Sequence, residues 1–203
     1  MAQVKATIVY YSATGTIEEM ARRVAQSAEK AGAEVRLRHV AEMAPNEVVE
    51  TNEEWQEHRD DAADVREPTP DDLTWADVVF FGTPTRFGAA ASQLQAFIDT
   101  LGPTWQEGGL ADKVYVGFTS SQTEHGGQES TLLSLYTAIM HWGGILVTPG
   151  YTDPIKFEDG NPYGVSHVTG ESNDAPLEES DLAALDHLAE RAVAVAAKLS
   201  LTP

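Results

Sequence analysis

Residues 6–17 read Ala6-Thr7-Ile8-Val9-Tyr10-Tyr11-Ser12-Ala13-Thr14-Gly15-Thr16-Ile17. An apolar run ends there in small hydroxylated residues, and helical spacing begins directly after them. The apolar positions that recur at i, i+3, i+4 and i+7 are Ile17, Met20, Ala21, Val24, Ala25 and Ala28. The stretch therefore predicts a buried strand, a loop and an amphipathic helix.

The loop between this strand and helix is suited to holding a phosphate. The N-terminus of a helix presents unpaired N–H groups and the positive end of the helix dipole. Ser12, Thr14 and Thr16 add hydroxyl donors, and Gly15 permits close backbone approach or a positive φ. The loop holds neither the Lys-Ser/Thr pair of a P-loop nor a Gly-x-Gly-x-x-Gly dinucleotide motif. We expect a pocket for a terminal phosphomonoester.

A purely structural interpretation of the same loop is a capping box. Thr16 fits the N-cap position, and Glu19 stands three residues later. Capping accounts for one hydroxyl, but it leaves Ser12 and Thr14 unexplained at alternate positions where the strand ends. Phosphate binding is therefore the favoured interpretation.

Length and composition limit the class of protein. The chain has 203 residues, 42% of them hydrophobic, which predicts a single domain over 1–203. No apolar run is long enough to span a bilayer and the N-terminus has no export signal, so we expect a cytoplasmic protein. Because cysteine is absent, thiolate chemistry and iron–sulfur ligation are excluded, and any redox chemistry requires a bound cofactor.

The charge balance argues against two classes of partner. Thirteen basic residues stand against thirty-two acidic ones, which gives a formal net charge of -19. Such a surface repels a phosphodiester backbone or an anionic membrane. We expect neither nucleic-acid binding nor membrane insertion.

Strands and helices alternate along the rest of the chain. Further strands are predicted at 34–39, 77–82, 113–118 and 145–147, and helical spacing recurs at 92–101, 132–140 and 182–199. This alternation predicts an α/β fold with a doubly wound, five-stranded parallel sheet and helices on both faces.

Residues 43–74 are acidic and polar, and they show no sustained periodicity. We interpret them as a long connection with room for one short helix and no site. His58 lies here between Glu57 and Arg59, a setting typical of a solvated surface histidine.

Two more strands end in loops of unusual composition. The third strand runs into 83–88 and the fourth into 119–127, both rich in small, hydroxylated or glycine residues. Ligands of doubly wound sheets lie beyond the carboxyl ends of the strands, at a topological switch point. We therefore expect both loops to meet the phosphate loop.

The phosphate loop, the segment Gly82-Thr83-Pro84-Thr85-Arg86-Phe87-Gly88 and the Gly-Gly-Gln-Glu at 126–129 together resemble the WrbA family of flavodoxin-like NAD(P)H:quinone oxidoreductases. The resemblance covers nearly the whole chain. It implies the flavodoxin-like strand order 2-1-3-4-5, non-covalently bound FMN, NADH or NADPH as electron donor, and two-electron reduction of a quinone. It also implies a homodimer or homotetramer in which neighbouring subunits complete each site.

The resemblance also implies roles for particular residues. The phosphate of FMN would be held by Ser12, Ala13, Thr14, Gly15, Thr16 and Ile17. The flavin ring would be contacted by Thr85, Arg86 and Phe87 on one side and by Ser120, Ser121, Gln122, Thr123 and Gly126 on another. His141 matches the family histidine near the flavin, and Trp105 matches the tryptophan over the substrate pocket. Alternatively, His141 caps its helix and Trp105 serves only packing. No protein nucleophile and no metal ligand is expected.

Two other functions use the same phosphate loop. A flavodoxin-type carrier would pass single electrons to protein partners, and an acidic surface suits it. A non-catalytic FMN-binding protein would show no turnover. Trp105, His141 and the long irregular segment 150–176 are more structure than a carrier needs, so the enzyme is favoured.

Overall fold

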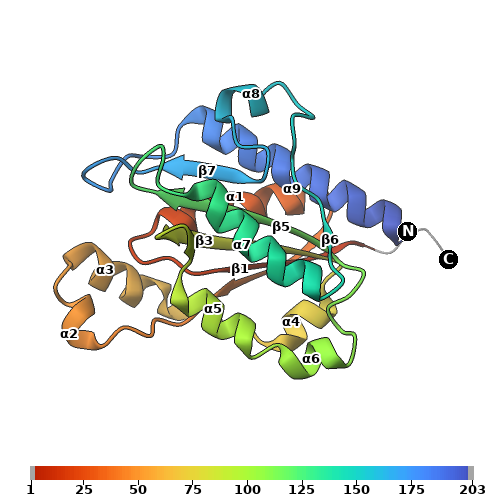
Figure 1. Cartoon of the computed structure of the whole chain (residues 1–203), viewed down its shortest axis with the longest axis horizontal. Coiled ribbons are helices and arrows are strands. Elements are labelled where there is room, and N and C mark those ends of the chain that lie inside the picture. The colour runs from red at the N-terminus through yellow and green to blue at the C-terminus, as the bar shows by residue number, and fades with distance from the viewer. Residues whose placement is uncertain (1–2, 201–203) are drawn as a thin grey trace.

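The computed structural model describes residues 3–200. Strands alternate with helices along the chain (Figure 1). The strands are β1 (Lys5–Tyr10), β2 (Glu34–His39), β3 (Val78–Arg86), β4 (Ala89–Ala90), β5 (Val114–Ser121), β6 (Ile145–Leu146) and β7 (Val165–Val168). The helices are α1 (Thr16–Lys30), α2 (Asn46–Val49), α3 (Glu53–Asp61), the 3-10 turn η1 (Ala62–Asp64), α4 (Pro70–Trp75), α5 (Ser92–Asp99), α6 (Gly102–Gln106), α7 (Gln128–His141), α8 (Lys156–Asp159) and α9 (Glu179–Leu199).

The strands form one sheet whose main path is β2-β1-β3-β5-β6. These strands pair in parallel, as the right-handed crossovers of a doubly wound fold require. The prediction of a five-stranded sheet is wrong, because residues 3–200 form seven strands. The short β4 pairs antiparallel with β3, and β7 pairs in parallel with β5.

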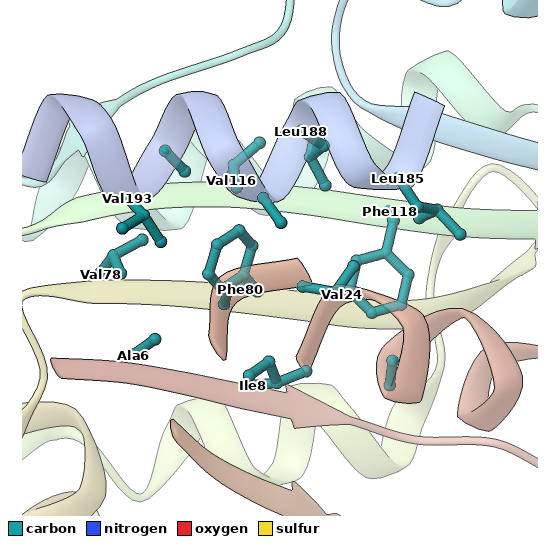
Figure 2. Close-up of a cluster of buried hydrophobic side chains, with 14 of the residues drawn as sticks. Ala6, Ile8, Val24, Val78, Phe80, Val116, Phe118, Leu185, Leu188 and Val193 are labelled. Atoms are coloured by element: carbon teal, nitrogen blue, oxygen red, sulfur yellow. The ribbon is translucent and has the colours of Figure 1, made fainter. Parts of the chain in front are cut away.

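Successive residues of the central strands point to opposite faces of the sheet, and each face is covered by helices. On one face, Ile8 and Phe80 pack with α1 and α9 (Figure 2). On the other, Val9 and Phe81 pack with α5 and α7. The predicted two-sided covering of the sheet is confirmed. No helix within residues 3–200 is both long enough and apolar enough to cross a membrane.

The last position of the sheet is occupied by two separate strands. β6 pairs with Val114 and Tyr115 at the start of β5, whereas β7 pairs with 118–121 at its end. Residues 147–164, which include α8, loop out between them. Only the first of these strands was predicted, because a four-residue strand among glycines and prolines gives little periodic signal.

A buried ion pair anchors this insertion. The side chains of Lys156 and Asp159 are both fully buried, and the ammonium donates to Asp159 Oδ2. Lys156 Nζ also donates to Gly164 O at 2.9 Å, and Asn161 N donates to Asp159 Oδ2 at 3.1 Å. Burial lowers the pKa of Lys156 and raises the pKa of Asp159, and the charge of each partner opposes the shift of the other.

Strands β3 and β5 continue beyond the ends predicted for them. β3 reaches Arg86 and β5 reaches Ser121, so part of each predicted loop is strand. Pro84 is tolerated because β1 stops pairing at Gly82, which leaves Pro84 with only β5 as a parallel neighbour. The extension carries polar residues outward beyond β1 on two adjacent strands.

The polar segment 43–74 is more structured than the sequence indicates. It holds α2, α3, η1 and α4 instead of at most one short helix. Helices this short show little apolar periodicity in the sequence. Their starts are marked instead by capping hydrogen bonds. Asn52 Oδ1 accepts from Trp55 N at 3.0 Å at the start of α3, and Thr69 and Asp72 form a capping box at α4.

Candidate functional site

The carboxyl ends of β1, β3 and β5 meet around one cavity. Its volume is about 220 Å³. The residues that line it are Ser12, Ala13, Thr14, Thr16, Ile17, Pro84, Thr85, Arg86, Ser120, Ser121, Gln122, Thr169 and Asn173. The three predicted loops therefore come together, as the topological rule required.

Gly15 shapes the phosphate loop. It is the N-cap of α1, with φ 102° and ψ -29°, a left-handed conformation that favours glycine. Ser12 Oγ accepts from Gly15 N at 3.1 Å, which folds the loop back on itself. Within residues 3–200 no side chain caps α1, so the capping box of the alternative interpretation, with Thr16 as N-cap and Glu19 three residues later, is absent. The uncapped start of this helix faces the cavity with donors for an anion.

Threonine hydroxyls connect the ends of β3 and β5 beside the cavity. Thr85 Oγ1 and Thr119 Oγ1 lie 3.0 Å apart, and Thr119 Oγ1 donates to Thr83 O at 2.7 Å. These internal bonds fix the strand ends without charge. Arg86 is the one charged side chain among the described residues that line the cavity, and its guanidinium is held by Thr85 O at 3.2 Å.

Three residues that line the cavity were not predicted as site residues: Pro84, Thr169 and Asn173. Thr169 follows β7, and its Oγ1 donates to Asn173 Oδ1 at 2.8 Å. Asn173 Nδ2 in turn donates to Thr14 Oγ1 at 3.3 Å, so the segment after β7 closes over the phosphate loop. Asn173 has φ 61°, which asparagine tolerates better than most residues. Because this contact spans most of the chain, no local pattern could reveal it.

Phe87 lies at the tip of the β3–β4 hairpin and outside the cavity. Both turn residues have positive φ, 52° for Phe87 and 78° for Gly88, and the aromatic ring is fully exposed. It borders a second, open hollow of about 630 Å³, which Tyr11, Trp55 and Gln93 also line. An exposed aromatic ring held by a strained turn is available to contact a ligand or another chain.

Besides Gly15 and Phe87, four further predicted residues do not line the cavity. Thr123 and Gly126 lie beside it, in the β5–α7 loop, where Ser121 Oγ donates to Thr123 O at 2.7 Å. His141 and Trp105 are remote, because α7 carries His141 about 20 Å away along its fourteen residues.

His141 and Trp105 instead contact each other. Trp105 Nε1 donates to His141 O at 3.1 Å, and His141 Nδ1 donates to Thr137 O at 2.9 Å within its own helix. Within one chain, His141 therefore bonds at the carboxyl end of α7, as the alternative interpretation expected.

Behind the loop, Glu18 is held by two partners. Its Oε1 accepts from Arg22 Nε at 2.7 Å, and its Oε2 lies 2.7 Å from His58 Nε2. The hydrogen bond from His58 is the main cause that lowers the pKa of Glu18, to about 2. Only 11% of the His58 side chain is exposed, so the expectation of a solvated surface histidine is wrong. α3 turns this residue inward, and its charged sequence neighbours Glu57 and Arg59 gave no indication of that burial.

The Glu18 carboxylate makes acid stability a test of this geometry. Its pKa falls from 4.5 in the unfolded chain to about 2, so its contribution is present above about pH 4.5 and is lost as the pH falls towards 2. When the pH falls through this range, the unfolding free energy of both proteins should decrease. We expect the decrease to be larger in the parent than in Glu18→Gln, by up to about 3 kcal/mol. Urea denaturation at several pH values measures the difference. Parallel curves for the two proteins would contradict the contact.

Comparison with known proteins gives three kinds of match. A family model described as NADPH-dependent FMN reductase matches residues 9–152. A protein named NAD(P)H dehydrogenase (quinone) from Deinococcus radiodurans is 49% identical over 199 residues, covering 98% of each chain. A second protein of that name, from Geotalea uraniireducens, is 38% identical over 202 residues, covering 97% of this chain and 99% of that one.

Solved structures with the same fold include a WrbA-like flavodoxin from Agrobacterium tumefaciens. Its TM-score is 0.70 at 23% identity, with 97% of this chain and 99% of that chain covered. Flavodoxin 2 from Bacillus cereus has a TM-score of 0.62 at 19% identity, with 95% and 99% covered. At these identities the likeness establishes a flavodoxin-like fold.

Proposed function

The chain belongs to the NADPH-dependent FMN reductase family, and from this premise we propose that the cavity at the carboxyl ends of β1, β3 and β5 is its FMN site. The chain is an FMN-dependent NAD(P)H:quinone oxidoreductase of the WrbA family, like its relatives named NAD(P)H dehydrogenase (quinone). Its substrates are a quinone and NADH or NADPH. When bound, FMN supplies the redox chemistry, which is hydride acceptance from the nicotinamide and two-electron transfer to the quinone.

The residues of the cavity fit FMN. The uncapped N-terminus of α1, with Gly15 in a left-handed conformation, suits the terminal phosphate, and this observation carries the proposal. The neutral hydroxyls of Ser12, Thr14 and Ser120 suit the ribityl chain and the phosphate oxygens. Arg86 would set the charge beside the flavin ring. In this role the chain binds and orients, and it contributes no nucleophile.

We also propose that Trp105 and His141 act in a neighbouring subunit's site. They lie together at the far end of α7 from their own cavity, which leaves them free to border another copy's flavin. The exposed apolar side chains of Leu133 and Met140, also on α7, would be covered in such an assembly. A homodimer or homotetramer would repeat this contact by two-fold symmetry. Association would strengthen with salt, because each chain carries a formal charge of -19.

Trp105→Ala is expected to retain FMN and to lose most of its quinone turnover. An aromatic wall supplies stacking area for a planar acceptor, so we expect kcat/KM for the quinone to fall about tenfold. Stopped-flow quinone reduction, with bound flavin quantified by absorbance, measures both properties. Phe157→Ala, which removes an exposed aromatic ring from α8, is the matched control and should leave turnover unchanged.

Mixing two variant chains tests whether Trp105 acts in its own chain's site or in the site of a neighbouring subunit. Chains that carry Gly15→Val are expected to lack FMN but still to present Trp105 to a neighbour. Mixed with Trp105→Ala chains, they should restore part of the quinone turnover. Turnover that stays low in the mixture would contradict the shared site, and unchanged turnover in Trp105→Ala alone would leave this residue with a packing role.

The activity assay also separates the enzyme from an electron carrier. The protein loaded with FMN should oxidise NADH or NADPH rapidly when quinone is added and slowly without it. A flavodoxin-type carrier would show no such nucleotide oxidation.

We further propose that the whole chain, 1–203, acts as one FMN-binding domain in the cytoplasm, without nucleic-acid or membrane partners, in keeping with its acidic charge.

A further inference from the structure

His58 reaches the phosphate loop from outside the sheet. It lies on α3, in the segment between β2 and β3, and its ring packs against the start of α1. The ring atom Cδ2 lies 3.5 Å from the point where a Cβ on Gly15 would stand. Its Nε2 lies 2.7 Å from Glu18 Oε2. One side chain thus contacts both the N-cap and the first turn of the helix that borders the cavity.

Glu18 creates an electrostatic conflict at this position. A carboxylate in the first turn of a helix competes with a bound anion for the same positive helix end. A phosphate dianion on the loop and the Glu18 carboxylate would also repel each other where solvent is partly excluded. Both oxygens of Glu18 are occupied, one by Arg22 and the other by His58. These two contacts hold the carboxylate in place, and the Arg22 guanidinium offsets part of its charge.

The surroundings of His58 leave Glu18 as its polar partner. His39 lies edge-on to it with ring centroids 5.8 Å apart, and Tyr10 lies 5.1 Å beyond His39. Within residues 3–200, Tyr10 OH, His39 Nε2 and His58 Nδ1 are buried without a hydrogen-bond partner. Burial lowers the pKa of His39, so it is a neutral neighbour. The orientation of the His58 ring therefore depends on its bond to Glu18.

We propose that His58 is a positioning residue of the phosphate site, which fixes the Glu18 carboxylate and thereby lets the start of α1 accept the phosphate of FMN. This inference rests on the proposed function, because it assigns a role at the same cavity. It makes the α3 segment, remote in sequence from every predicted loop, a determinant of cofactor affinity. It also predicts that the effect is specific for the phosphate group.

The test compares FMN with riboflavin, which has the same ring and ribityl chain but no phosphate. Each is titrated into the cofactor-stripped full-length protein and followed by flavin fluorescence. In His58→Ala we expect the Kd for FMN to rise about tenfold, as expected for an unfavourable charge at a helix N-terminus. The Kd for riboflavin should change less than about twofold.

A double variant separates charge from packing. Glu18→Gln combined with His58→Ala removes the carboxylate that His58 holds in place, so FMN affinity should return to within about threefold of the parent. If His58 acts only by packing against Gly15, the double variant stays as weak as the single one. Glu57→Gln removes an exposed charge from the same helix and is the control, with no expected change.

Three results would overturn the inference. These are an unchanged FMN Kd in His58→Ala, equal weakening of FMN and riboflavin, and no recovery in the double variant. If His58→Ala does not fold, His58→Leu keeps the packing volume without the donor and enters the same comparison. Failure of the proposed function is distinguishable, because the parent itself would then bind FMN no more tightly than riboflavin.

Discussion

Gly15→Val is expected to abolish FMN binding while the chain stays folded. Gly15 has φ 102°, which a branched side chain adopts only with strain, so the loop between Ser12 and Thr16 must move. A displaced loop withdraws N–H groups from the phosphate. With the loss of two charge-assisted hydrogen bonds we expect affinity to fall at least about a hundredfold. Flavin titration measures the loss, and circular dichroism of the apoprotein verifies the fold.

Gly32→Val is the matched control for backbone strain. Gly32 stands beyond the other end of α1 with φ 92°, and no atom lies within 4 Å of the position of its Cβ. We expect a comparable destabilisation of about 1–2 kcal/mol with FMN affinity intact. If Gly15→Val bound FMN as tightly as the parent, the assignment of the phosphate loop would be refuted. If both variants lost FMN affinity equally, the loss would be explained by general destabilisation of the fold.

Asp159→Ala is expected to cause the largest loss of stability. It leaves the Lys156 ammonium fully buried with only a carbonyl as partner, and breaking a buried pair from one side costs about 3–5 kcal/mol. A chain of this length should then melt about 10 °C lower. Thermal denaturation followed by circular dichroism measures the shift.

Removing both charges provides the control. Lys156→Met together with Asp159→Leu replaces the pair with apolar groups of similar volume, and we expect stability within about 2 kcal/mol of the parent. A single variant as stable as the parent would mean that water reaches Lys156 in solution. A double variant as unstable as Asp159→Ala would mean that the bonds to Gly164 and Asn161, and not the uncompensated charge, dominate.

The fold was largely predictable because its central elements carry strong periodic signals. The continuous apolar runs of β1, β3 and β5 follow from burial on both faces of the sheet, and the helical spacing of α1 follows from burial of one face of the helix. The elements that depend on local caps, or on pairing with one neighbouring strand, were not predicted from the sequence. α2, α3 and η1 have few apolar residues, and β7 exists because β5 extends to Ser121 and offers it a partner. Neither cause is visible in a local sequence window.

The lining of the cavity at the candidate site was predictable where one loop supplies several residues. The phosphate loop and the ends of β3 and β5 meet because parallel strands end together. Contacts that depend on distant segments were not predictable. Asn173 reaches Thr14 across most of the chain, and His58 is turned inward only by the packing of α3. The family resemblance placed Trp105 near a flavin, but within one chain it lies at the opposite end of α7.

The divided last position of the sheet has a consequence for solubility. An open sheet edge is a template on which other chains can add a strand and aggregate. Here the strands at one edge, β6 and β7, are two and four residues long and separated by an insertion, so neither offers a long pairing surface. The opposite edge, β2, carries Arg36 and Arg38, both paired with Asp72, and His39 N at its end donates to Arg66 O. Short strands on one side and charged residues on the other thus protect both edges from intermolecular β-pairing, including while the cofactor is absent.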